Sequence, residues 1–370
     1  MTLARYFLMP VTMPIGLPRL CLVLLLLAVV SFPVIPARAE RGGEGGKPDA
    51  SRNKPPVAGK SAVSDKAIAT DQQGSDDASS PSSVQGRSPF GREFHPRRLA
   101  GPLEKLETQL AEARRAFAAD PDDPDKLIWL GRRLGYVWRM QEAIEVYTRG
   151  IKRWPDNAAL YRHRGHRYIS VREFDKALVD LMHAAELIRD KPDVIEQDGM
   201  PNDRNIPLTT LGFNIYYHLG VAHYATGDYH ASVLAFKQAM VFGRKHADNV
   251  VACIDWSYLA NLQIGRPLRA EKLLSVINPE MEIIENHAYF QRLLVYKGVR
   301  TFEEVWGKTD DELQRLTLGY GLSRWLLEQS REDEAKKILR TLIASEYWPA
   351  FGVVAAEAEW YNRKGTWGEP

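Results

Sequence analysis

The chain has 370 residues, of which 45% are hydrophobic, and a formal net charge of +2 at pH 7. This length can bury a sizeable core, and the near-neutral charge gives no overall field that would favour nucleic acid or an acidic membrane surface as a partner. The two cysteines are Cys21 and Cys253. Only Cys253 lies beyond residue 39, so a chain cleaved there would have no intramolecular disulfide and must be stabilised by packing.

Residues 1–39 have the pattern of a secretory signal peptide. Positive charges precede an apolar run from Leu20 to Ile35, and Ala37-Arg38-Ala39 has the small-x-small form of a cleavage site. The run is shorter than the roughly 20 residues that span a bilayer as a helix. We therefore expect cleavage near Ala39 and a periplasmic or secreted protein, with membrane contact only if the segment stays uncleaved.

Residues 40–100 are rich in glycine, serine and proline and contain few large apolar residues. Such a segment cannot bury enough apolar surface to fold, so we predict a disordered linker here. The folded domain is then expected at residues 101–370. It should begin with a helix over 103–119, where leucines and Phe117 recur at helical spacing before the break at Asp120-Pro121.

A repeat of thirty-four residues follows. Gly131 matches Gly165, Ala143 matches Ala177, and larger residues such as Leu134 and Tyr168 keep the same offset. This is the period of a two-helix solenoid unit, in which small residues allow two helices to approach closely. The clearest units are expected at 124–157, 158–190 and 213–246.

These residues resemble the tetratricopeptide repeat (TPR) pattern. The first unit has Leu130-Gly131, Leu134, Ala143, Tyr147 and a late Pro155. The resemblance implies an all-α, TPR-like helical-repeat solenoid, built as a right-handed superhelix of antiparallel helix pairs. Nothing in residues 100–370 alternates with the period of a strand.

An insert separates the second and third units. Gly220 lies fifty-five residues after Gly165, so one period of thirty-four leaves twenty-one extra residues, which we place at about 191–212. Its carboxylates and amides, with Glu196, Asp198 and Asn202 as the chief candidates, make it either a binding element or a tolerated insertion. Its oxygens are of the type that binds calcium, but their spacing does not match a twelve-residue calcium loop.

Residues 250–370 carry degraded repeats and a terminal cap. Helical periodicity continues over 283–295, 301–306, 311–328 and 332–344. The apolar residues that follow Trp348-Pro349 are typical of a last helix that closes the exposed end of the stack.

The first helix of each TPR pair lines the concave face, so the resemblance implies a set of ligand-binding side chains there. This set is Arg132, Tyr136, Arg162, His166, Asn214, Tyr217, Tyr224 and Asp255. Guanidinium, aromatic and amide groups suit a peptide backbone or a carboxylate, so a protein or peptide partner, possibly an acidic one, is expected. The alternative is a solvated basic surface. Arg149 lies on a second helix and should face away.

The leading interpretation is an exported adaptor or scaffold that binds a protein along its concave groove and is not an enzyme. We predict no cofactor, no metal site and no nucleic acid partner, because no phosphate loop or spaced ligand set occurs. A small-ligand or glycan-binding module that uses the insert is the alternative. A hydrolase with Glu196 or Asp198 and His218 is the least favoured, since nothing in the sequence fixes their geometry.

Overall fold

The computed structural model describes residues 84–96, 102–307 and 311–370. The expected signal peptide and the expected linker as far as residue 83 lie outside the described residues. All described residues belong to one compact unit, 65–370.

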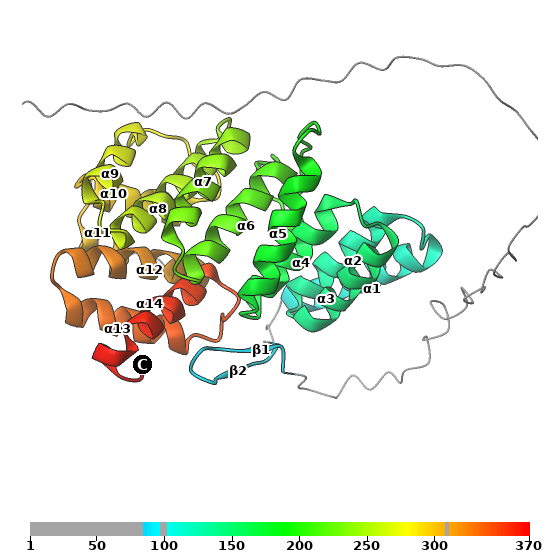
Figure 1. Cartoon of the computed structure of the whole chain (residues 1–370), viewed down its shortest axis with the longest axis horizontal. Helices are drawn as coiled ribbons and strands as arrows, with labels where there is room; N and C mark the ends of the chain where they lie inside the picture. Colours follow the sequence, from blue (N-terminus) through cyan, green and yellow to red (C-terminus); the bar gives the residue numbers. More distant parts are fainter. Residues whose placement is uncertain (1–83, 97–101, 308–310) are drawn as a thin grey trace, which may run out of the picture. The chain divides into compact units, whose positions relative to one another are not determined.

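The described residues form a short β-hairpin followed by α-helices (Figure 1). The strands β1 (Gly86–Arg87) and β2 (Glu93–Phe94) pair antiparallel. The first seven helices are α1 (Pro102–Ala119), α2 (Pro124–Tyr136), α3 (Met140–Arg153), α4 (Ala158–Ser170), α5 (Phe174–Ile188), α6 (Leu211–Ala225) and α7 (Tyr229–Gly243). The others are α8 (Ala247–Gln263), α9 (Pro267–Leu273), a 3₁₀ turn (Leu274–Val276), α10 (His287–Tyr296), α11 (Phe302–Trp306), α12 (Glu312–Glu328), α13 (Glu332–Ala344) and α14 (Phe351–Trp367).

Helices α2 to α7 form three consecutive pairs of neighbouring helices. In each pair a glycine of the first helix faces a large side chain of the second. A Cβ atom on Gly165 would lie 2.8 Å from Cγ of Leu181, and one on Gly220 would lie 2.7 Å from Cζ of Phe236. Only glycine allows this close approach, so the predicted all-α repeat fold is confirmed.

The turn inside each of these three pairs, and the turn between α8 and α9, has a residue with positive φ at an equivalent position. These residues are Trp138 (φ 61°), Arg172 (φ 68°), Gly227 (φ 82°) and Gly265 (φ 68°). Glycine adopts this left-handed conformation freely, whereas another residue costs about 1–3 kcal/mol. Trp138 offsets that cost because its side chain is buried and packs edge-on against Trp348, with ring centroids 5.6 Å apart.

The last helix does not lie at a free end of the stack. Helix α14 packs against α12 and α13 and also against α6. Its buried Glu357 accepts a hydrogen bond from Nε of Arg172 at 2.8 Å, and Phe351 lies 5.5 Å from the ring of His166. The expected terminal cap therefore packs against the second and third units. There Arg172 binds the buried carboxylate of Glu357, and His166 packs against the ring of Phe351.

The hairpin is a second difference from the sequence prediction, which placed residues 84–96 in a disordered linker. Phe94 is buried and stacks on Trp348 at a centroid distance of 4.9 Å. The indole N–H of Trp348 donates to the carbonyl of His95 at 2.8 Å, and the side chain of Gln141 donates to the carbonyl of Gln85 at 2.5 Å. This segment folds because the helical domain supplies the apolar surface that the segment itself lacks.

The predicted helical segments beyond residue 250 agree with the structure except at Ile283–Asn286. These residues form a loop whose backbone N–H groups point at one carboxylate. Asp248 accepts hydrogen bonds from Ile284 at 3.1 Å, Glu285 at 2.7 Å and Asn286 at 2.8 Å. The buried carboxylate satisfies these groups, so the helix α10 starts only at His287.

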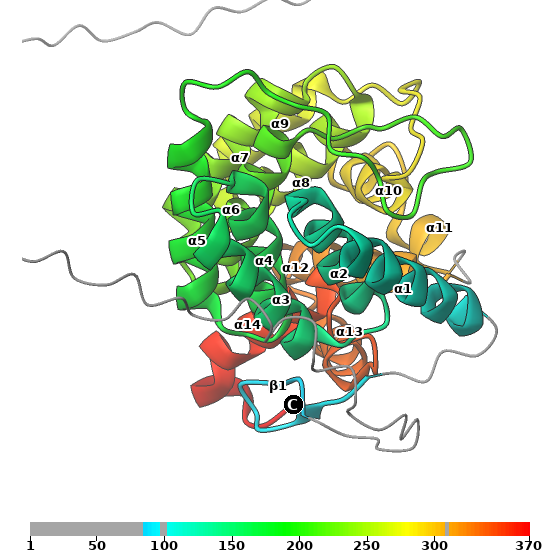
Figure 2. The ribbon, with the colours of Figure 1, turned by 90° about the vertical axis from the view of Figure 1, so that its right-hand side faces the viewer.

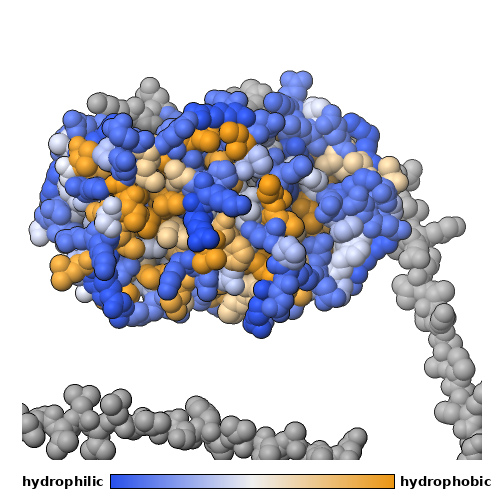
Figure 3. Space-filling view, turned by 90° about the horizontal axis from the view of Figure 1, so that it is seen from above, coloured by the Kyte–Doolittle hydropathy of each residue, from blue (hydrophilic) through white to orange (hydrophobic). Residues whose placement is uncertain are grey.

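No helix among the described residues is long and apolar enough to cross a membrane. Several large apolar side chains are exposed, for example Leu234 on α7 and Leu268 on α9. In the view from above, apolar patches are separated by hydrophilic groups (Figure 3). This face of the domain therefore offers no continuous apolar strip.

Candidate functional site

Two of the concave-face candidates, Arg162 and Asn214, converge on one carboxylate, that of Glu196 in the insert. Nη1 of Arg162 lies 3.3 Å from Oε1 of Glu196, and Nδ2 of Asn214 donates to Oε2 at 3.0 Å. Nε2 of His163 lies 3.2 Å from Oε1. Three groups from α4 and α6 therefore surround a carboxylate that is itself largely buried.

The segment after Glu196 is held through its backbone. Arg132 donates from Nη2 to the carbonyl of Gln197 at 2.8 Å, and Arg133 donates from Nη1 to the carbonyl of Gly199 at 3.0 Å. Gly199 lies directly against the hydroxyl of Tyr136, with no room for a Cβ atom. We call residues 196–199 with their partners on α2, α4 and α6 the Glu196 groove.

Charge in the Glu196 groove is set by burial. Burial lowers the pKa of His163 to about 3, and the neighbouring Arg162 acts in the same direction. The neutral ring accepts from Arg162 at Nδ1, at 2.7 Å, which leaves Nε2–H to donate to Glu196. Burial alone would raise the pKa of Glu196, but Arg162 and His163 hold it well below its usual range.

The remainder of the insert reaches the other side of the domain (Figure 2). Asn202 donates from Nδ2 to Oε1 of Glu285 at 2.5 Å, and Arg204 pairs with Glu282. Asp198 is exposed and accepts from the backbone N–H of Met200 at 3.0 Å, which is a local turn. Of the three insert candidates, only Glu196 contacts the concave-face side chains.

His166 and Tyr217 line a separate cavity of about 370 Å³. Two further predicted residues lie in the core instead of on a reachable surface. Tyr224 bonds the hydroxyl of Tyr320 at 2.5 Å, and Asp255 pairs with the buried Arg292. Both side chains are buried, so Tyr224 and Asp255 cannot contact a partner along an open groove.

The structure adds His163, Arg133 and Tyr289 to the predicted residues. The one signal for His163 in the sequence is its place three residues before His166 on the same helix. Nothing in the sequence indicates Tyr289, which comes from α10, outside the clear repeats. His218 is the histidine considered for a hydrolase. Its Nδ1 is hydrogen-bonded to the carbonyl of Asn214 at 2.6 Å, and it forms no hydrogen bond to Glu196 or Asp198.

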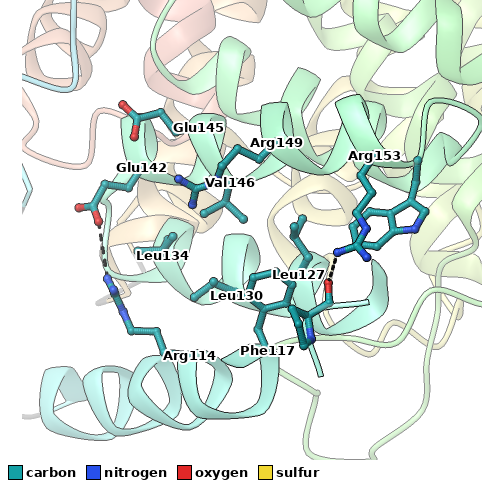
Figure 4. Close-up of a pocket in the computed structure, with 12 residues that line it drawn as sticks. Arg114, Phe117, Leu127, Leu130, Leu134, Glu142, Glu145, Val146, Arg149 and Arg153 are labelled. Atoms are coloured by element: carbon teal, nitrogen blue, oxygen red, sulfur yellow. Dashed lines mark hydrogen bonds and ion pairs between the residues drawn. The ribbon is translucent and has the colours of Figure 1, made fainter. Parts of the chain in front are cut away.

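Another cavity, of about 460 Å³, lies between α1, α2 and α3 (Figure 4). Leu127, Leu130 and Val146 line it, and an ion pair between Arg114 and Glu142, 3.6 Å long, spans from α1 to α3. Arg149 belongs to this cavity and not to the concave face. Within 84–96, 102–307 and 311–370, no group of three or more histidine, cysteine or acidic side chains could hold a metal ion.

No protein-family model matches the chain. Over 98 residues the chain is 29% identical to tetratricopeptide repeat protein 13 of Homo sapiens. This match covers 26% of the chain and 11% of that protein, so the chain spans about a tenth of the length of this curated relative.

Three solved structures have low TM-scores with the chain. MamA (AMB-1) has a TM-score of 0.35 and 20% identity, with 46% of this chain and 86% of that one covered. YrrB, described as a TPR protein with an unusual peptide-binding site, has 0.36 and 12%, covering 67% and 97%. A tetratricopeptide repeat protein from Parabacteroides merdae has 0.37 and 15%, covering 70% and 94%. The repeat register, the glycine-closed helix pairs and the sequence match agree on an all-α, TPR-like helical-repeat fold.

Proposed function

We propose that the protein is an interaction scaffold that binds an extended acidic segment of a partner protein in the Glu196 groove, in place of its own insert. The observation that supports this proposal is the way the groove holds residues 196–199. A carboxylate is bound by Arg162, His163 and Asn214, and two backbone carbonyls are bound by Arg132 and Arg133. The same contacts fit any extended peptide with an acidic side chain.

The chemistry of these contacts favours a peptide over other partners. Arg132 and Arg133 of α2 donate to two carbonyls that lie two residues apart in the segment, those of Gln197 and Gly199. Charge-assisted hydrogen bonds of this kind are the strong ones. The three arginines that hold the segment, Arg132, Arg133 and Arg162, are positive, so an acidic side chain of a partner would replace Glu196 as the carboxylate beside Arg162. We also propose that the protein acts outside the cytoplasm, because of the signal-like segment at residues 1–39.

The test replaces residues 194–209 by a short Gly-Ser linker and supplies the peptide Val194–Pro201 separately. We expect the altered protein to bind this peptide, as measured by calorimetry, while the unaltered protein does not bind it. A peptide with Glu196→Gln should bind at least about tenfold more weakly, or ~1.4 kcal/mol, because it loses the carboxylate. Higher salt should weaken binding of the unchanged peptide.

Two variants of the altered protein serve as a matched pair. Arg162→Glu should abolish peptide binding, because it reverses a charge that contacts the carboxylate. Arg149→Glu makes the same charge reversal on α3, away from the Glu196 groove, and this variant should still bind the peptide. The proposal would be overturned if both variants lost peptide binding equally while still melting cooperatively. That result would mean that the peptide is attracted only by the overall positive charge of this region.

A further inference from the structure

The cavity beside His166 and Tyr217 is open to solvent on one side, and five helices and the loops before α10 and α14 contribute to its lining. Side chains of α4, α6, α10, α12 and the start of α14 line its volume of about 370 Å³. The ring of Phe351 packs against the rings of Tyr217 and His166, with its centroid 6.4 Å and 5.5 Å from theirs. The size lies in the range of small-molecule pockets. We call it the Tyr217–Tyr289 cavity.

The two tyrosine hydroxyls of this cavity cannot satisfy each other completely. The indole N–H of Trp256 can only donate, and it donates to the hydroxyl of Tyr217 at 3.0 Å. The hydroxyls of Tyr217 and Tyr289 lie 2.9 Å apart, so one of them donates to the other. The remaining hydroxyl hydrogen has no acceptor among the described residues.

His166 provides a second donor of the same kind. The guanidinium of Arg167 can only donate, and its Nη2 lies 3.0 Å from Nδ1 of His166, so Nδ1 carries no proton. Burial and the charge of Arg167 lower the pKa of His166, which keeps the ring neutral with its hydrogen on Nε2. The ring of His218 lies 4.3 Å away by centroids, but no hydrogen bond joins the two rings.

We propose that the Tyr217–Tyr289 cavity binds a small planar molecule that presents a carbonyl or carboxylate oxygen. Aromatic walls favour a flat apolar body, and two hydrogen-bond donors without acceptors favour an oxygen that accepts from both. The surroundings carry charges of both signs, since Arg167 lies behind His166 and the lining includes the carboxylate of Glu285, which accepts from Nδ2 of Asn202. This site is distinct from the Glu196 groove, because none of the groove side chains lines the cavity. The cavity shares only the helices α4 and α6 with the groove, through His166 and Tyr217.

Three simple probes test the ligand chemistry in the intact protein. Benzamide and benzoate present an sp² oxygen on a flat ring, whereas benzylamine presents only a cationic donor. With ¹⁵N-labelled histidine, we expect benzamide or benzoate to shift the Nε2 resonance of His166 at millimolar concentration, and benzylamine to leave it unchanged. Comparison of benzamide with benzoate separates a carbonyl ligand from a carboxylate ligand.

Variants of His166 test the donor itself. His166→Met removes the N–H and should weaken benzamide or benzoate binding at least about tenfold, whereas His166→Gln keeps an N–H donor and should retain most of it. His183→Met, an exposed histidine on α5, is the matched control and should bind normally.

The tyrosines give a second test that does not depend on the stability of the His166 variants. Tyr289→Phe and Tyr217→Phe each leave one hydroxyl free to donate, so each should still bind. Tyr216→Phe, whose ring stacks on Phe242 away from the cavity, is their control. Binding of benzylamine as tight as that of benzamide, or no shift at His166 with any of the three probes, would overturn the proposal.

Discussion

At the scale of single residues, burial decides which ionisable groups of the Glu196 groove carry charge. Arg162 and His163 lie side by side on α4, and their positive charges would repel each other if the imidazole were protonated. The neutral form of His163 instead relays a hydrogen bond from the guanidinium to the carboxylate of Glu196. Burial and Arg162 therefore keep His163 neutral, and Glu196 accepts the hydrogen bond that orients its ring.

The pH dependence of stability follows from His163. Its pKa in the folded protein is about 3, whereas an unperturbed histidine titrates near ~6.5. Between these pH values the unfolded chain binds more protons than the folded one, so stability rises with pH across this window and is lost on acidification. Burial lowers the pKa of His166 and His218 in the same direction.

We therefore expect the melting temperature to fall steadily as the pH is lowered from 7 to about 4. His163→Gln, which removes one titrating group but keeps an N–H donor, should make this dependence shallower. His183→Gln should leave it unchanged, because His183 is exposed on α5. A slope for His163→Gln identical to that of the unaltered protein would show that His163 does not contribute.

At the scale of helices, the glycine of each pair sets how closely the two axes approach. Gly165→Leu should destabilise the domain by about 1–3 kcal/mol or more, because the new side chain would overlap Leu181. The matched control is Gly365→Leu on α14, where a Cβ atom has no neighbour within 4 Å. Thermal melting of both variants checks the prediction, and an unchanged melting temperature for Gly165→Leu contradicts it.

The helix pairs could be predicted because their packing is local in sequence. Gly131, Gly165 and Gly220 meet side chains of the next helix, so the sequence period reports the contact directly. The conformation of the insert could not be predicted, because Glu196 is recognised by Arg162 and Asn214 through side-chain geometry, without any period. Nor could the hairpin be predicted, since Phe94 stacks on Trp348, which is more than two hundred residues away in the sequence.

At the scale of the molecule, the hairpin ties the segment before α1 to the segment before α14. Phe94→Ala should cost roughly 3–5 kcal/mol, because the side chain is buried between Trp348 and the guanidinium of Arg172. Phe90→Ala removes a phenylalanine side chain from the same hairpin at a position where it is only partly buried. This change should lower the free energy of unfolding by less than Phe94→Ala does.

Removal of the hairpin gives an independent measurement. A truncated protein that starts at residue 102 should melt at a lower temperature than one that starts at Val84. Equal melting temperatures for the two would mean that the hairpin adds nothing to the stability of the helices, whatever the effect of Phe94→Ala.

The pairing of Arg172 with Glu357 changes how the domain is expected to unfold. A stack of repeats with contacts only between neighbours can fray from either end, since each unit depends on the next one alone. Here a turn of the second unit is joined to the last helix by a buried ion pair across 185 residues of sequence. If either partner is lost, the other is left as a buried charge without its counter-charge. The two halves of the domain therefore lose their structure in one cooperative transition instead of unit by unit.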